Sequence, residues 1–260
     1  MFGFLRRRRR SRLLAEPFPA WREVVLRRNM PLYDRLSAVE RGTVQDVVRL
    51  LVGEKRWEGC SGLTVTDEIK LTIAAWAGVL ILGLDFGIYD RISSIVVYPT
   101  VFATPNADDD WEDDGLSDAA LEGQAVYRGP VILSWDTILT ESRNLESQSN
   151  LVLHEFAHHI DFLDGEVDGT PPLPSRDLAK RWGPVMQAAY DRHLAELATG
   201  GETFFTEHAG RDEGEFFADA VEAFFCLPHD LEAEESEVFV LLVAYFRVQP
   251  KAWYPERDGV

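Results

Sequence analysis

Apolar residues recur at helical spacing along most of the chain, so helices are its main predicted elements. The helix predicted over residues 66–84 is apolar on nearly every side, which is typical of a central, buried helix. Two short apolar runs, at 95–98 and 131–135, are typical of strands. The pattern predicts an α+β fold that is mostly helical and contains a small mixed sheet. Further helices are predicted over residues 44–52, 151–164, 178–197, 212–226 and 236–248.

The predicted helix over residues 151–164 carries the sequence H-E-F-A-H, in which His154 and His158 flank Glu155. Residues four apart lie one above the other on the same helix face, so both imidazoles can bind one metal ion. Glu155 stands beside them, within reach of a water molecule at the metal. This H-E-x-x-H spacing is that of zinc metallopeptidases. Apolar residues around the motif would anchor such a helix, which favours the motif over a chance match.

A catalytic zinc ion usually has three protein ligands and one open position, so a third ligand is expected elsewhere in the chain. The predicted helix over residues 212–226 places Glu215, Asp219 and Glu222 on one face. We predict Glu215 as the third ligand and Asp219 as a carboxylate that holds a ligand imidazole, a spacing that matches gluzincins. Glu222 is the alternative ligand, or a further supporting carboxylate.

Asp161 competes locally for these roles, because it shares a face of the predicted helix with His154 and His158. We predict that Asp161 supports the metal ligands without contacting the metal. The alternative is direct metal binding, as in aspzincins. The residues predict one zinc ion per chain as the cofactor.

The composition narrows the class of protein. Apolar residues make up 46% and charged residues 27%, as in an ordinary soluble globular protein. The formal charge of −18 argues against nucleic acid or an anionic membrane as the main partner. Two cysteines, Cys60 and Cys226, imply neither a disulfide framework nor a thiolate zinc site. The acidic stretch at 105–118 lacks the alternating ligands and the glycine turn of a calcium loop, so we interpret it as a solvated loop.

No internal repeat or long linker divides the chain, so one domain is predicted over residues 17–250. Its N-terminal helical part would cover 17–90 and its catalytic core 91–250. Residues 1–16 are expected to form a flexible basic tail, and 251–260 a C-terminal tail. The basic stretch lacks the apolar segment of a secretory signal, and no apolar run is long enough to cross a bilayer. We therefore expect a cytoplasmic protein.

Several sequence blocks follow one another along the chain. They are PLY at 31–33, EGCSGL at 58–63, VTDE at 65–68, IVVYP at 95–99, GPVILSWD at 129–136, HEFAH at 154–158, DGTP at 168–171 and EFFA at 215–218. With these blocks, residues 17–250 resemble the Mlc titration factor A family of zinc peptidases. The resemblance implies a zincin-like, gluzincin-like core related to the protease domain of anthrax lethal factor. It also implies His154, His158 and Glu215 as zinc ligands and Glu155 as the catalytic base.

The resemblance further implies peptidase activity, with aminopeptidase activity reported in the family, and hence a peptide or protein substrate. The founding member binds the glucose repressor Mlc, which implies a transcription repressor as a partner and a role in regulating sugar uptake. The favoured function is peptide hydrolysis by a zinc-activated water. The alternative is a regulatory protein that sequesters a repressor, with a mainly structural zinc site.

His208 departs from the pattern of the family. The family commonly has a tyrosine seven residues before the third ligand, where it can stabilise the transition-state oxyanion. An imidazole can also donate a hydrogen bond, so His208 is the candidate for this catalytic role, with a different pH dependence. The alternative is a solvent-facing loop histidine.

Overall fold

The computed structural model describes residues 2–100, 129–201 and 203–254. Its α-helices are α1 (Phe2–Ala15), α2 (Ala20–Asn29), α3 (Ala38–Glu54), α4 (Asp67–Leu80), α6 (Trp135–Arg143), α7 (Leu151–Asp161), α8 (Arg176–Thr199), α9 (Glu213–Cys226), α10 (Pro228–Glu234) and α11 (Ser236–Phe246). Short 3-10 helices are η1 (Pro31–Asp34), η2 (Phe86–Arg91), η3 (Glu207–Gly210) and η4 (Pro250–Trp253). The strands are β1 (Arg56–Gly59), β2 (Ser94–Tyr98) and β3 (Val131–Ser134). The predicted fold class, mostly helical α+β with a small sheet, is confirmed.

Local sequence signals decide where the main helices begin. The Thr66 side chain accepts a hydrogen bond from the Ile69 N–H and caps α4, as the sequence predicts. Helix α3 starts earlier than its apolar pattern suggests, because Ser37 and Glu40 form a reciprocal capping box at its first turn. The predicted helix over 44–52 is therefore only the middle of a longer one.

The sheet has the order β1-β2-β3, and each neighbouring pair of described strands is parallel. Trp57 pairs with Ile95, and Ile95 pairs in turn with Val131. A mixed sheet was expected, whereas the pairing among the described strands is parallel throughout. Parallel neighbours need a long crossover, and between β1 and β2 this crossover contains α4 and η2. The predicted acidic loop at 105–118 lies outside the described residues.

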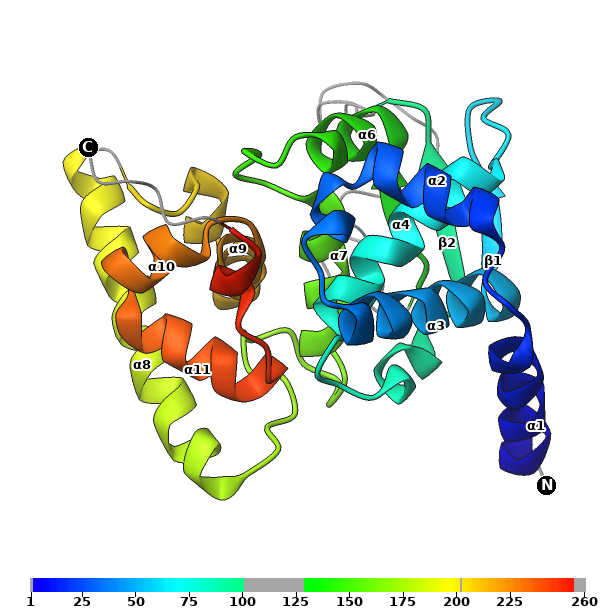
Figure 1. The fold of residues 1–260 in the computed structure, drawn as a ribbon. Helices are drawn as coiled ribbons and strands as arrows, with labels where there is room; N and C mark the ends of the chain where they lie inside the picture. The colour runs from blue at the N-terminus through cyan, green and yellow to red at the C-terminus, as the bar shows by residue number, and fades with distance from the viewer. Residues whose placement is uncertain (1, 101–128, 202, 255–260) are drawn as a thin grey trace, which may run out of the picture.

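One apolar core extends from Leu26 to Trp253 and includes nearly the whole of α4. Figure 1 shows α8 to α11 on one side of the molecule and the earlier elements on the other. Helices α7 and α9 pack against each other across the boundary between these two groups. The candidate site lies between these two helices.

The basic stretch that was expected to form a flexible tail is helix α1 in the structure. Its arginines find carboxylate partners on later elements: Arg10 pairs with Glu54 at the end of α3 and with Asp90 on η2. These partners lie 44 and 80 residues further along the chain, which is why the local sequence did not indicate them. No helix among the described residues has the length and apolar character needed to span a bilayer.

Candidate metal centre

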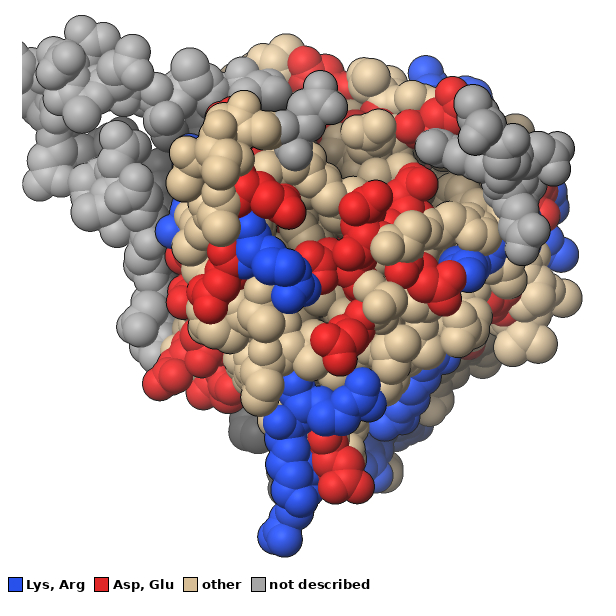
Figure 2. Space-filling view, turned by 90° about the vertical axis from the view of Figure 1, so that its left-hand side faces the viewer, with Lys and Arg blue, Asp and Glu red and all other residues tan. Residues whose placement is uncertain are grey.

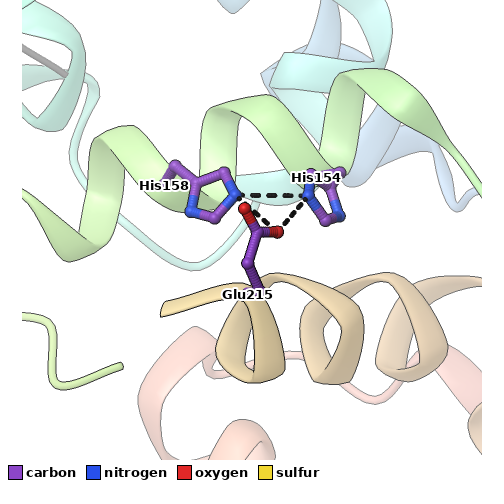
Figure 3. Close-up of side chains that lie close together, drawn as sticks. All are labelled: His154, His158 and Glu215. Atoms are coloured by element: carbon purple, nitrogen blue, oxygen red, sulfur yellow. Dashed lines mark hydrogen bonds and ion pairs between the residues drawn. The ribbon is translucent and has the colours of Figure 1, made fainter. Parts of the chain in front are cut away.

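Helix α7 aims the two histidines of the H-E-x-x-H sequence at one point. The helix begins after Asn150, whose side chain accepts a hydrogen bond from the Leu153 N–H at 3.1 Å. Its apolar residues Val152, Phe156 and Ile160 are fully buried in the core. This burial fixes the rotation of the helix and leaves the histidines facing α9 (Figure 3).

Helix α9 supplies a carboxylate to the same point. Asp212 caps this helix by accepting a hydrogen bond from the Glu215 N–H at 2.9 Å. Glu215 Oε2 lies 3.1 Å from His154 Nε2 and 3.3 Å from His158 Nε2, and the two imidazole nitrogens are 3.2 Å apart. Figure 3 shows the three side chains pointing toward one another from the two helices. Three metal-ligating atoms therefore converge without any rearrangement.

The spacing of these atoms fits a zinc ion. Tetrahedral zinc with ligands at about 2.0–2.1 Å separates its ligand atoms by roughly 3.3 Å. The observed separations of 3.1, 3.2 and 3.3 Å lie within a few tenths of an ångström of that value. Two imidazoles with one carboxylate are also the donor set of several catalytic zinc sites. The residues present therefore suit zinc.

Glu222 lies one turn further along α9 than Asp219 and contacts the His154 ring at Nδ1, the nitrogen that faces away from Glu215. Its Oε1 accepts a hydrogen bond from His154 Nδ1 at 2.6 Å, and its Oε2 accepts one from the Asn150 N–H at 2.7 Å. A proton fixed on Nδ1 leaves the Nε2 lone pair directed at the shared point. Burial by itself lowers the pKa of His154, but the hydrogen bonds to Glu215 and Glu222 outweigh it and raise that pKa well above its usual value.

Glu155 is a half-buried carboxyl next to the candidate ligands. Burial raises the pKa of Glu155, while the nearby His154 and His158 act in the opposite direction. Burial also raises the pKa of Glu215, but hydrogen bonds from the two histidines outweigh burial and lower it overall. Glu215 is therefore held as an anion, whereas the raised pKa lets Glu155 bind a proton more readily than a free glutamate does, which suits proton transfer.

His208 lies at the site and not on a remote loop. Its Nε2 is 3.0 Å from Glu215 Oε2, the same oxygen that faces His154 and His158. The side chain is 41% exposed, so it borders both the candidate ligands and the solvent. Asp219 Oδ2 accepts a hydrogen bond from the Thr206 N–H at 2.8 Å, and Thr206 caps the short helix η3 that carries His208.

Asp219 and Asp161 thus make contacts other than the expected support of an imidazole. Asp219 tethers the segment before His208, although its carboxylate lies within 4.8 Å of ligand atoms of His154 and Glu222. Asp161 Oδ2 accepts a hydrogen bond from the Gly169 N–H at 2.9 Å, and its buried Oδ1 has no hydrogen-bond partner within the described part of the chain. Burial raises the pKa of Asp161 to about 7.

Two residues that the sequence did not single out join this arrangement. Asn150 is both the cap of α7 and the backbone partner of Glu222. Glu141 on α6 accepts a hydrogen bond from the Leu151 N–H at 2.7 Å, at the same helix terminus. An asparagine directly before an apolar-periodic run is a recognised helix-start signal and could have identified Asn150. Nothing in the sequence around Glu141 points to its partner.

Comparison with known proteins bears on this geometry. Residues 4–247 match the model of a family described as glucose-regulated metallo-peptidase M90. The chain belongs to this M90 family. It is similar to an uncharacterized protein of Synechocystis, with 30% identity over 247 residues, covering 93% of this chain and 89% of the relative. It is likewise similar to Mlc titration factor A of Yersinia enterocolitica, with 31% identity over 259 residues, covering 95% and 93%. Mlc titration factor A of Yersinia pestis is 29% identical over 245 residues, covering 92% and 87%.

Membership of the M90 family makes a metallopeptidase-like protein the general class of this chain. The comparison also explains the sequence blocks described above, because it extends over nearly the whole of the expected domain. The cluster of His154, His158 and Glu215 is the one part of the described structure where two imidazoles and a carboxylate could hold a metal ion together.

Proposed function

We propose that this chain is a zinc-dependent peptidase in which His154, His158 and Glu215 hold one zinc ion. The observation that carries the proposal is the convergence of Nε2, Nε2 and Oε2 from two separate helices at the spacing that zinc requires. Membership of the M90 family supports peptide hydrolysis as the reaction.

A bound zinc ion supplies Lewis-acid chemistry, because it polarises a peptide carbonyl and lowers the pKa of water. Glu155 accepts a proton from the attacking water at its carboxylate and delivers it to the leaving amine nitrogen. His208, which borders the solvent at the site, donates a hydrogen bond from its imidazole to the oxyanion of the tetrahedral intermediate. Glu222 keeps His154 in the tautomer that leaves Nε2 free for the metal.

The substrate is a peptide or protein, and cleavage from the amino end is the mode we favour within that class. Figure 2 shows acidic side chains gathered on the face that belongs to the α8–α11 side of the molecule. Together with the formal charge of −18, this favours neutral or basic peptides over acidic ones as substrates. We place the protein in the cytoplasm.

A second function is favoured by the names of the relatives. Two of them are called Mlc titration factor A. In the family that the sequence resembles, the founding member binds the glucose repressor Mlc. We propose a transcription repressor of this type as a partner, and through it a role in sugar uptake. In the alternative reading, repressor capture is the main function and the zinc site serves to hold α7 and α9 together.

Replacing Glu155 with Gln tests the catalytic proposal. The variant Glu155→Gln keeps the three candidate ligands, so it should bind one zinc ion per chain as the wild type does. It should lose at least 10²-fold in peptide cleavage, because the amide cannot accept the proton. Metal content is measured by mass spectrometry and cleavage with a library of short peptides.

Repressor capture measured on the same variant separates the two functions. Retained capture with lost cleavage would show that binding does not need the chemistry. Unchanged turnover in Glu155→Gln, with metal bound, would refute Glu155 as the base.

A further inference from the structure

Helix α1 lies far from the candidate metal site, at the edge of the molecule (Figure 1). One side of the helix faces the body: Arg6 and Arg10 pair with Asp90, Arg10 also pairs with Glu54, and Leu13 lies against Gly53. Residues 6, 10 and 13 share one helix face, because they are four and seven positions apart. The position of α1 is thus set by specific contacts.

The opposite side of α1 has a different character. It presents Arg7, Arg8 and Arg12, which are all exposed. Within the part of the chain that the structure describes, none of these three side chains forms an ion pair or a hydrogen bond. The formal charge of the whole chain is −18, so this row of free cations is a local exception to an acidic protein. These positive charges can act locally, because salt largely screens carboxylates that lie more than about 8–10 Å away.

The first turns of the same helix expose two large apolar side chains. Phe4 is 70% exposed and Leu5 is 58% exposed, although most large apolar residues of this protein are buried. The two residues directly precede the run of arginines. Exposed apolar residues next to several arginines are typical of helices that bind at the membrane interface. In such helices Phe and Leu enter the boundary between headgroups and acyl chains, and Arg contacts the headgroups.

A cavity of about 380 Å³ lies at the base of the helix, between α1 and the body. Its charged lining residues are Arg6, Arg9, Arg10, Lys55, Glu54 and Asp90. Four cations thus face two carboxylates, which leaves a surplus of two positive charges. The carboxylates are already paired with Arg6 and Arg10, and the other two cations, Lys55 and Arg9, donate hydrogen bonds to backbone carbonyl oxygens. The surplus positive charge of the cavity therefore adds to the positive potential around α1.

We propose that the outer face of α1 docks on a membrane surface that contains anionic phospholipids. Phe4 and Leu5 enter the interface, and Arg7, Arg8 and Arg12 contact the headgroups. The expectation that the protein has no membrane partner rested on the net charge of the whole chain, which hides the separate charge of this helix. The protein would lie on the membrane through α1 without a helix that crosses it.

The apolar tip distinguishes this partner from nucleic acid. A nucleic-acid backbone would be bound by arginines alone, and the salt-dependent attraction would account for the whole affinity. Two exposed apolar side chains next to the arginines would not contribute to the affinity of such a complex. On an anionic bilayer they contribute by burial, and each arginine contributes by attraction to the surface.

The experiment measures binding of the full-length protein to vesicles by flotation at 0.15 M salt. Vesicles of phosphatidylcholine alone are compared with vesicles that also contain phosphatidylglycerol. The wild type should bind only the anionic vesicles. The variant Arg7→Gln/Arg8→Gln/Arg12→Gln should lose about fivefold for each arginine, or on the order of a hundredfold in all. Glutamine has nearly the helix propensity of arginine, so α1 is preserved.

A matched control removes three positive charges from another exposed helical turn. The variant Arg176→Gln/Lys180→Gln/Arg181→Gln changes the start of α8 and should bind anionic vesicles as the wild type does. The variant Phe4→Ser/Leu5→Ser keeps every charge and should still lose at least tenfold.

Three results would overturn the proposal. The wild type could fail to bind anionic vesicles, or both triple variants could lose affinity equally, which would indicate a non-specific charge effect. The third result is tighter binding to a duplex DNA oligonucleotide than to anionic vesicles, unchanged by the Phe4 and Leu5 substitutions. That result would assign α1 to nucleic acid.

Discussion

Replacing Glu222 with Gln separates the two tasks that one carboxylate performs at the candidate metal site. Oε1 of Glu222 holds His154 Nδ1 at 2.6 Å, while Oε2 accepts the Asn150 N–H at 2.7 Å. The side chain of glutamine has one carbonyl oxygen and one NH2 group, and the NH2 group cannot accept a hydrogen bond. In Glu222→Gln one of these two contacts must therefore be lost, and the other becomes a weaker bond to a neutral acceptor.

The expected loss of zinc affinity is 10- to 100-fold, as is usual when a carboxylate behind a ligand imidazole is removed. This range corresponds to about 1.4–2.7 kcal/mol of binding free energy. The loss should be large here because the Glu222 side chain is only 10% exposed, so water replaces it poorly. The variant should also lose stability, because the Asn150 N–H is a buried donor at the start of α7.

Glu141→Gln is the control that separates metal affinity from stability. Glu141 accepts the Leu151 N–H at 2.7 Å, one residue from the donor that Glu222 binds. Among the described residues it forms no hydrogen bond with His154. Both variants should unfold at lower urea concentration, whereas only Glu222→Gln should bind zinc more weakly in a competition titration with a chromophoric chelator. Equal zinc affinity in the two variants would refute the role given to Glu222.

Three further predictions concern the surroundings of the site. Because burial raises the pKa of Asp161 from 3.8 to about 7, ionisation should cost the native state roughly 4 kcal/mol as the pH rises from about 4 to 7. Urea unfolding of the chelator-treated protein should show an advantage of Asp161→Asn that grows over this pH range and stays constant above it; a pH-independent difference would contradict this. Gly169 has a φ of +73°, and an added Cβ would lie 2.5 Å from the Glu213 carbonyl oxygen, so Gly169→Ala should cost clearly more than the ~1 kcal/mol expected for Gly62→Ala, where φ is +80° but no atom lies within 4 Å. Equal urea midpoints would show that the contact with Glu213 relaxes without cost. His208→Phe should lower the turnover number about 10²-fold with zinc content unchanged, while His208→Tyr, which restores a hydrogen-bond donor, should retain most activity; equal turnover of the two would exclude hydrogen bonding as the role of His208.

Features that depend on spacing within one helix could be predicted from the sequence. His154 and His158 share a face because they are four residues apart, and this holds for any regular helix. Glu215 could be predicted as their neighbour only by asking which other helix offers a carboxylate. Its side chain lies beside both histidines, and its role as a metal ligand is part of the proposed function. Packing between helices decided the rest. Glu222, and not Asp219, reaches His154, because the contact of α7 with α9 determines which carboxylate of the shared face lies behind the imidazole.

Other differences have the same origin in long-range contacts. Strand β1 has the sequence RWEG, which has no apolar alternation, and it exists because β2 offers it a parallel edge. Helix α1 was expected to be a flexible tail because its composition is basic, and it is fixed by carboxylates that only the folded chain brings near. Asp161 was expected to support a metal ligand, yet its described contact is with the turn at Gly169.

The candidate ligands come from two helices that lie 61 residues apart along the chain, one in each group of elements. An ion held by both would act as a cross-link that closes the long loop containing α8. Such a cross-link favours the native state by restricting the unfolded chain, and the gain grows with the concentration of free metal above its dissociation constant. The supply of zinc in the cell would therefore set how long this protein survives proteolysis, in addition to whether it can act.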